Sequence, residues 1–157
     1  MILAIDPGTT ESAFCFIDEQ MKPVRFGKCQ NIQLIGILQE EEYVRLVIEM
    51  IASYGMPVGK EVFETCVWIG RFVQVADDFC VHAEFVYRNE VKSNLCHSSK
   101  ANDATIKQAL VDRFAYNVSN HGKGKKDSPG WFYGFHRDIW SAYAVAITYA
   151  DTKEKGK

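Results

Sequence analysis

The sequence lacks the features that place a chain in a membrane or a secretion pathway. No apolar run approaches the ~20 residues needed to span a bilayer, and no basic region followed by a long apolar stretch opens the chain. Internal repeats are absent as well. From these absences and the length of 157 residues we expect a cytoplasmic protein without membrane contact, built as one domain over residues 1–152 with a flexible basic tail at 153–157.

Clustered metal-binding or disulfide-forming residues are missing too. The five cysteines are odd in number and widely spaced, no two of them form a Cys-x-x-Cys pair, and the four histidines are scattered. These spacings match neither a zinc site nor a disulfide framework. We therefore expect reduced, partly buried thiols.

A strong charge of one sign is also missing. The formal net charge of −2 does not by itself indicate nucleic-acid binding. The charge is uneven, however, because residues 121–126, His-Gly-Lys-Gly-Lys-Lys, are basic and rich in glycine. A cluster of carboxylates at an active site can hide a basic face in the sum, so DNA is not excluded as a partner.

What the sequence does contain is a series of apolar runs and amphipathic segments, which predicts an α/β fold with a mixed five-stranded sheet flanked by helices. The strand at 43–49 is nearly continuously apolar, as in a strand covered on both faces. We expect strands at 1–6, 12–18, 23–29, 43–49 and 82–88, a short helix or loop at 33–41, helices at 59–77, from 102 or 103 to 115 and at 137–151, a polar connector at 91–99 and a long loop at 117–135.

The opening residues, MILAIDPGTT, place a carboxylate at the end of an apolar strand. A buried charge in that position is costly unless it is paired or used. The turn Pro7-Gly8-Thr9-Thr10 can direct backbone N–H groups at an anion, so Asp6 would stand in a metal-and-phosphate site. The alternative is a turn former or helix cap, since Asp-Pro-Gly is common in turns.

Two further carboxylates stand among apolar residues. Glu49 ends the strand at 43–49, and Asp138 opens the last helix. Adjacent strands lie ~4.8 Å apart, so Asp6 and Glu49 can share a cation, and a helix packed across the sheet end adds the third acid. Such hard oxygen ligands favour two Mg²⁺ or Mn²⁺ ions, which can activate water and stabilise the leaving oxygen of a phosphodiester. Alternatively, Glu49 pairs with a lysine and Asp138 is a plain helix cap.

With these acids the chain resembles the RuvC-type Holliday junction resolvases, especially the small versions from bacteriophages, within the RNase H-like nucleases. The resemblance implies an RNase H-like fold and a homodimer without a nucleotide cofactor. In the host cytoplasm it would cut four-way or branched DNA by metal-dependent hydrolysis during phage recombination or packaging, leaving 5′-phosphates. The motifs that carry the resemblance are Ile5-Asp6-Pro7-Gly8, Ile48-Glu49, Val91-Lys92 with Ile106, and residues 142–148.

The last helix departs from the bacterial pattern, in which two metal-binding groups stand one turn apart. Asp138 matches the first group and Ser141 stands at the second; alternatively Asp138 is the second and His136 serves nearby as a catalytic residue. Asp103 stands about where bacterial relatives carry a basic residue. It is either a fourth metal ligand or only a cap for the helix 104–115.

The resemblance also implies contacts to DNA phosphates, because a junction is recognised by shape rather than by sequence. Arg71 and Phe72 are possible contacts that the sequence does not place. The helix at 59–77 offers more apolar surface than one sheet face needs. The surplus would either form a dimer seam or pack in the core, and the residues concerned are Phe63, Val67, Trp68 and Phe72. The phosphate-binding candidates are Lys92, Lys100, Lys107, Arg113, Lys123, Lys125 and Lys126.

Two other classes of protein fit part of the pattern. Asp6-Pro-Gly-Thr-Thr also resembles the phosphate loop of actin-like ATPases and sugar kinases, but those need a second lobe and a Gly-rich adenosine site, which 157 residues do not provide. A non-cleaving module that binds branched DNA would share the resolvase fold, and Ser141 in place of an acid keeps this alternative open. Cleavage of a junction with Mg²⁺ separates the nuclease from this module.

Overall fold

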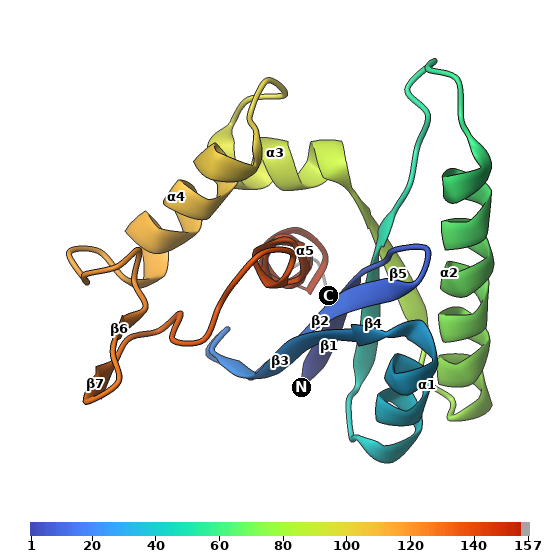
Figure 1. Ribbon diagram of the computed structural model, residues 1–157, viewed down its shortest axis with the longest axis horizontal. Helices are drawn as coiled ribbons and strands as arrows, with labels where there is room; N and C mark the ends of the chain where they lie inside the picture. The colour runs from blue at the N-terminus through green and yellow to red at the C-terminus, as the bar shows by residue number, and fades with distance from the viewer. Residues whose placement is uncertain (155–157) are drawn as a thin grey trace.

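The computed structural model describes residues 1–154 and is built on a mixed sheet with strand order β3-β2-β1-β4-β5 (Figure 1). The first three strands, β1 (Ile2–Asp6), β2 (Glu11–Ile17) and β3 (Pro23–Gln30), pair antiparallel. The other two, β4 (Arg45–Met50) and β5 (Ala83–Tyr87), run parallel to β1. The predicted five-stranded mixed sheet is confirmed.

Helices cover both faces of the sheet (Figure 1). One face packs against α1 and α2, and the other packs against α5, which α3 and α4 cover in turn. The helices are α1 (Asn31–Glu40), α2 (Lys60–Asp78), α3 (Arg88–Cys96), α4 (Asp103–Phe114) and α5 (Ile139–Tyr149), and a π-helical segment, η1 (Ala150–Glu154), follows.

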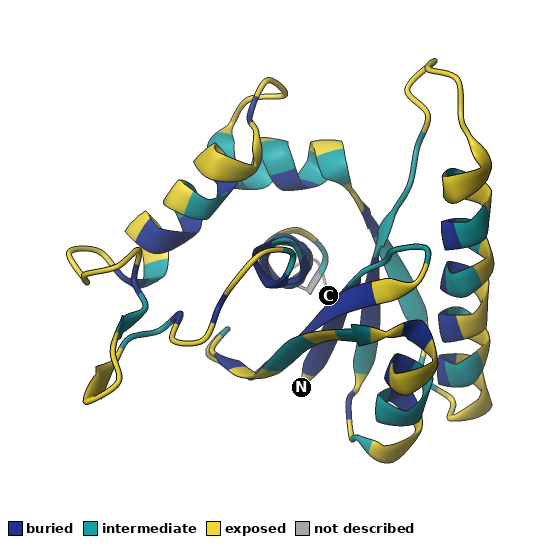
Figure 2. Ribbon diagram, in the orientation of Figure 1, coloured by how far each residue is buried: buried dark blue, intermediate teal, exposed yellow. Residues whose placement is uncertain are grey.

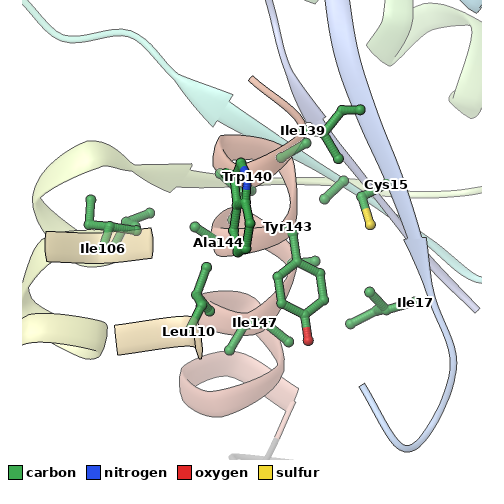
Figure 3. Close-up of a cluster of buried hydrophobic side chains, with 14 of the residues drawn as sticks. Cys15, Ile17, Ile106, Leu110, Ile139, Trp140, Tyr143, Ala144 and Ile147 are labelled. Atoms are coloured by element: carbon green, nitrogen blue, oxygen red, sulfur yellow. The ribbon is translucent and has the colours of Figure 1, made fainter. Parts of the chain in front are cut away.

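The alternation of side chains along each strand divides the core into two layers. In β1, Ile2 and Ala4 face α5, whereas Leu3 and Ile5 face α1 and α2. Apolar on nearly all sides, α5 is buried at every position except Ser141 (Figure 2). Figure 3 shows this helix between β2 and α4. The burial fixes α5 against the sheet and therefore fixes where its first residue stands.

The prediction of a polar connector at 91–99 is wrong, because residues 88–96 form the helix α3. The carboxylate of Glu90 accepts a hydrogen bond from the backbone N–H of Tyr87 at 2.7 Å, which caps the first turn. Val91 and Leu95, four residues apart, pack on the α5 side of the core. Three apolar positions in nine residues, with Cys96 next to Leu95, make too short a pattern for periodicity to reveal the helix.

The segment expected as a long loop at 117–135 contains a two-stranded hairpin, β6 (Gly124–Lys125) and β7 (Ser128–Pro129). Gly124 has φ +68°, and a Cβ there would lie 2.4 Å from the carbonyl oxygen of Ser128, so the hairpin needs glycine. Phe132 and Phe135 are fully buried and tie the segment to the core. The hairpin thus projects from a fixed base.

The last helix begins two residues later than expected, at Ile139, because Arg137 has a left-handed backbone with φ +44°. At the other end, the basic tail expected at 153–157 lies outside the described residues from position 155 onward. Lys153 belongs to η1, and its ammonium group donates to the Phe85 carbonyl at 2.5 Å. No helix in the described part of the chain is long and apolar enough to cross a bilayer.

Candidate active site

Two of the predicted acids stand side by side at one edge of the sheet. Asp6 is the last residue of β1, and Glu49 is the penultimate residue of the parallel neighbour β4. Ala4 and Val47, two residues before each acid, face α5. Because side chains alternate along a strand, Asp6 and Glu49 face α5 as well, beside the point where Asp138 precedes that helix.

The turn after Asp6 is held by a small buried hydrogen-bond network. The Gly8 N–H donates to the Ser12 hydroxyl at 3.1 Å, and that hydroxyl donates to the side-chain oxygen of Asn31 at 2.6 Å. The Asn31 amide then donates to the Gly8 carbonyl at 2.9 Å. A Cβ on Gly8 would lie 2.3 Å from the Glu11 carbonyl oxygen, so the turn requires glycine. Together these contacts fix the end of β1 and hence the direction of Asp6.

Burial and mutual repulsion keep a proton in this group of acids. Burial first, then Glu49 and Asp138, raise the pKa of Asp6 to about 8. Burial also raises the pKa of Glu49, while Arg88 and a side-chain hydrogen bond with Asp6 act in the opposite direction. A protonated Asp6 donating to a Glu49 carboxylate accounts for both shifts. Without a metal ion, the pair therefore holds one proton near neutral pH.

Two basic side chains that the sequence analysis did not consider complete the charge balance. Lys28 of β3 donates to Asp138 at 2.6 Å, and Arg88 of α3 lies 3.8 Å from Glu49. Both stand on the α5 side of the sheet. Lys28 pairs with Ala13, which faces α5, and Arg88 comes two residues after Val86, which also faces α5.

The site opens into three cavities that share their lining residues. One, of about 550 Å³, lies between the Pro7–Thr10 turn, Lys28 and Asp138. A second, of about 420 Å³, continues from Asp138 past His136 to α4 and the hairpin. The third, of about 220 Å³, lies over Asp6 and Glu49. The three cavities adjoin at Asp6, Asp138 and Arg88, and we call them together the depression around the acids.

The structure corrects the interpretation of Asp103. The helix cap is Asn102, whose side-chain oxygen accepts from the Thr105 N–H at 3.0 Å, so Asp103 is not the cap of α4. The Asp103 carboxylate is 82% exposed and instead forms an ion pair with Arg88. Since Arg88 also approaches Glu49, Asp103 belongs to the site through Arg88, and no direct contact joins it to the other acids in the described part of the chain.

The residues proposed as metal ligands or helpers near the N-terminus of α5 lie close to one another. Asp138 occupies the cap position of α5 but makes no capping hydrogen bond with its side chain, so the plain-cap alternative does not describe it. His136, Ser141 and Asp103 line the same cavity as Asp138. Asp6 lines the adjoining cavity together with Asp138, and Glu49 lines the third cavity together with Asp6.

The donor set fits a hard divalent cation, although the acids are not arranged around one. Within the described residues, no three Cys, His, Asp or Glu side chains converge closely enough to hold a metal ion as they stand. Three carboxylates without a thiolate are nevertheless the donors that Mg²⁺ and Mn²⁺ prefer. Their charge is offset instead by Lys28, Arg88 and the proton on Asp6.

The candidate phosphate contacts divide into four groups. Lys107 lines the 420 Å³ cavity and lies 5.1 Å from the centre of the Trp140 ring. Arg113 donates to both carboxylate oxygens of Asp151, at 2.6 and 2.9 Å, so its guanidinium already has a partner within the fold. Lys92 is half-buried in α3 and Lys100 is exposed. The remaining three, which we call the hairpin lysines, are Lys123, at the edge of the same cavity, and the exposed Lys125 and Lys126.

The α2 side chains proposed for a dimer seam differ in how far they are exposed. Phe63 and Val67 are 61% and 64% exposed. Phe72 is fully buried in the core, so its assignment to the seam or to DNA is wrong. Arg71 lies over the Trp68 ring at 4.1 Å. Tyr54, in the loop before α2, is exposed and lines the cavity over Asp6 and Glu49. No sequence motif had indicated this residue.

Comparison with solved structures identifies the fold. RuvC of Thermus thermophilus matches with a TM-score of 0.70 and 15% identity, over 99% of this chain and 96% of that chain. T. thermophilus RuvC in complex with a Holliday junction substrate gives 0.72 and 12%, over 99% and 95%. This chain has the fold of the RuvC-type Holliday junction resolvases. The Fowlpox virus resolvase, solved with Holliday junction DNA, gives 0.59 and 12%, over 97% and 99%.

The likeness lies in the structure rather than in the sequence. No family model matches the chain, and no curated protein is found to be similar to it. At these identities the comparisons establish the RuvC-type fold alone. The activity has to be argued from the residues at the site.

Proposed function

We propose that this protein is a metal-dependent endodeoxyribonuclease that resolves Holliday junctions and other branched DNA. The observation that carries the proposal is the placement of Asp6, Glu49 and Asp138 at one edge of a RuvC-type sheet, where they line adjoining cavities. Burying carboxylates close to one another destabilises the folded protein, and the rise of the pKa of Asp6 to about 8 reflects this. Acids that destabilise the fold and yet line open cavities are more readily explained by a function than by stability. The role we propose is in phage DNA recombination or packaging.

In this proposal, Asp6, Glu49 and Asp138 hold two Mg²⁺ ions, for which Mn²⁺ can substitute. The bound ions supply an activated water and stabilise the leaving oxygen of the phosphodiester. Asp6 must give up its proton before it can act as a ligand, because its pKa is raised. The network of Gly8, Ser12 and Asn31 holds Asp6 in place during this change.

The chain's basic residues would bind the DNA backbone around the acids. Lys107 and the hairpin lysines border or extend the depression on the α4 side. Such contacts are electrostatic and independent of base sequence, which suits a substrate recognised by its shape. Cleavage by this arrangement leaves a 5′-phosphate.

A homodimer would present two such sites to a junction. A four-way junction has approximate two-fold symmetry, so a two-fold dimer can cut two strands of like polarity. Phe63 and Val67 form the exposed apolar part of α2, which we propose as the centre of the seam. Large exposed apolar side chains on one helix face favour burial against a second copy.

The test is incubation of the purified protein with a synthetic four-way junction, with Mg²⁺, with Mn²⁺ and with chelator. We expect paired nicks of like polarity with either metal and none with chelator. The matched control is Asp138→Asn, which keeps the side-chain volume and removes the charge. Junction binding without cleavage under every condition would favour the non-cleaving module, and ATP turnover without cleavage would favour the kinase-like alternative.

A further inference from the structure

Lys28 is the basic residue most closely engaged with the acids, and its position carries a further inference. It lies on the edge strand β3, pointing to the α5 face, and its ammonium nitrogen is 2.6 Å from one oxygen of Asp138. The side chains of Lys28 and Asp138 are 28% and 48% exposed. Among the described residues, Asp138 is the one carboxylate within ion-pair distance of Lys28, while Glu11 and Arg137 act on it from farther away.

Arg88, the second basic residue of the site, is held differently. It approaches Glu49 at 3.8 Å and also forms an ion pair with Asp103, which lies outside the group of three acids. If Glu49 turned away, Arg88 would remain anchored on Asp103. Lys28 has no such second anchor among the described residues, so withdrawal of Asp138 would free its ammonium group.

We propose that Lys28 is the counter-ion of Asp138 in the metal-free protein, and that divalent cation binding releases its ammonium group to contact DNA phosphate. This rests on the proposed function, because it takes Asp138 as a ligand. A cation bound to Asp138 would stand within a few ångströms of the ammonium group and repel it. Lys28 lines the 550 Å³ cavity together with Asp6, Glu11 and Asp138, so its released ammonium group would stand where a phosphate entering that cavity can reach it.

The rival role for Lys28 is to orient Asp138 as an outer partner while the metal occupies the other carboxylate oxygen. The two roles predict opposite signs for metal affinity. If Lys28 competes with the metal, its removal tightens metal binding. If Lys28 orients the ligand, its removal weakens metal binding.

The experiment therefore starts with calorimetric titration of Mn²⁺ into DNA-free protein, comparing wild type, Lys28→Met and Lys28→Gln. We expect about fivefold tighter binding in both variants, as an ion pair of this exposure would give. Lys125→Met is the matched control, because it removes the same charge from an exposed position outside the three cavities, and its Mn²⁺ affinity should equal that of wild type. Circular dichroism confirms that the variants fold.

The second measurement is binding of a four-way junction, in chelator and in Ca²⁺, which replaces Mg²⁺ to slow hydrolysis. For Lys28→Met we expect unchanged affinity in chelator and about three- to tenfold weaker binding in Ca²⁺. The log–log salt slope in Ca²⁺ should be lower by ~0.9, because the variant neutralises one phosphate fewer. The control Lys125→Met should bind more weakly by the same factor in both conditions.

Unchanged or weaker Mn²⁺ binding by the Lys28 variants would overturn the proposal. An equal decrease of junction affinity in chelator and in Ca²⁺ would overturn it too, because release by the metal would then play no part. The metal titration contains no DNA, so it gives an answer even if wild-type protein fails to cut junctions. That failure would count against the proposed nuclease alone.

Discussion

Replacing Asp6 with asparagine should make the metal-free protein more stable at high pH, although it destroys the site. Because burial and the neighbouring acids raise the pKa of Asp6 to about 8, the folded state holds a proton that the unfolded chain releases near its usual pKa of ~3.9. Between these values the folded state binds more protons than the unfolded state. The stability conferred by that proton therefore falls as pH rises toward 8.

The size of this effect follows from linkage. A full proton difference changes the free energy of unfolding by ~1.4 kcal/mol per pH unit, so wild type should lose about 2 kcal/mol between pH 6 and pH 8 through this group. In Asp6→Asn the amide can donate to Glu49 as the protonated acid does, and it does not titrate. The advantage of the variant should therefore grow by about 2 kcal/mol over that interval, or roughly 4–8 °C in Tm for a chain of this size.

The assay is thermal unfolding of both proteins in chelator at pH 6, 7 and 8. The difference between the two Tm values cancels the contributions of titrating groups that do not interact with Asp6. Added Mg²⁺ at pH 8 should then raise the Tm of wild type and leave that of Asp6→Asn unchanged, since the variant lacks a ligand. A difference that stays constant with pH, or shrinks as pH rises, would refute the shared-proton account of Asp6 and Glu49.

The remaining predictions concern cleavage, DNA binding and assembly. Glu49→Gln and Asp138→Asn should each abolish junction cleavage while gel-shift affinity stays equal or rises, because a ligand is removed and repulsion toward phosphate falls. Asp103→Asn should lower the cleavage rate only in part, since it frees Arg88 rather than removing a ligand; a defect as complete as in Glu49→Gln would make it a ligand. Alanine at all three hairpin lysines should weaken binding to duplex and junction by similar factors in salt-titrated binding assays, and a junction-selective decrease would contradict this. Phe63→Glu should shift the protein to a monomer in sedimentation, and an unchanged mass would place the seam elsewhere.

The sheet and the two strand acids could be predicted because each depends on a local pattern. An apolar run that ends in a carboxylate defines both a strand and the edge at which its charge stands, as at Asp6 and Glu49. The continuous burial of α5 was also predictable from its composition, and it placed Asp138 at the sheet end. The missed helix α3 had no comparable pattern, because Val91 and Leu95 are its main apolar contacts with the core.

The basic half of the site could not be predicted in the same way. That Lys28 meets Asp138 depends on the antiparallel register of β2 with β3, which pairs Lys28 with Ala13, and on a sequence separation of 110 residues. A shift of that register by one residue would turn Lys28 to the opposite face. Sequence periodicity assigns a residue to a face only after the register is known.

The role of Asp103 shows why the ligand set itself depends on this missing information. If residues 91–99 were a connector, Arg88 would have no fixed place, and an acid near the expected site would be either a ligand or a cap. With α3 in place, Arg88 stands between Glu49 and Asp103, so the charge of Asp103 is already matched by a cation. Asp103 is also 82% exposed and reaches the other acids only through Arg88, whereas Glu49 is 15% exposed and stands on the strand beside Asp6. The acids can therefore be found from the sequence, but deciding which of them bind metal requires knowing where the basic residues lie.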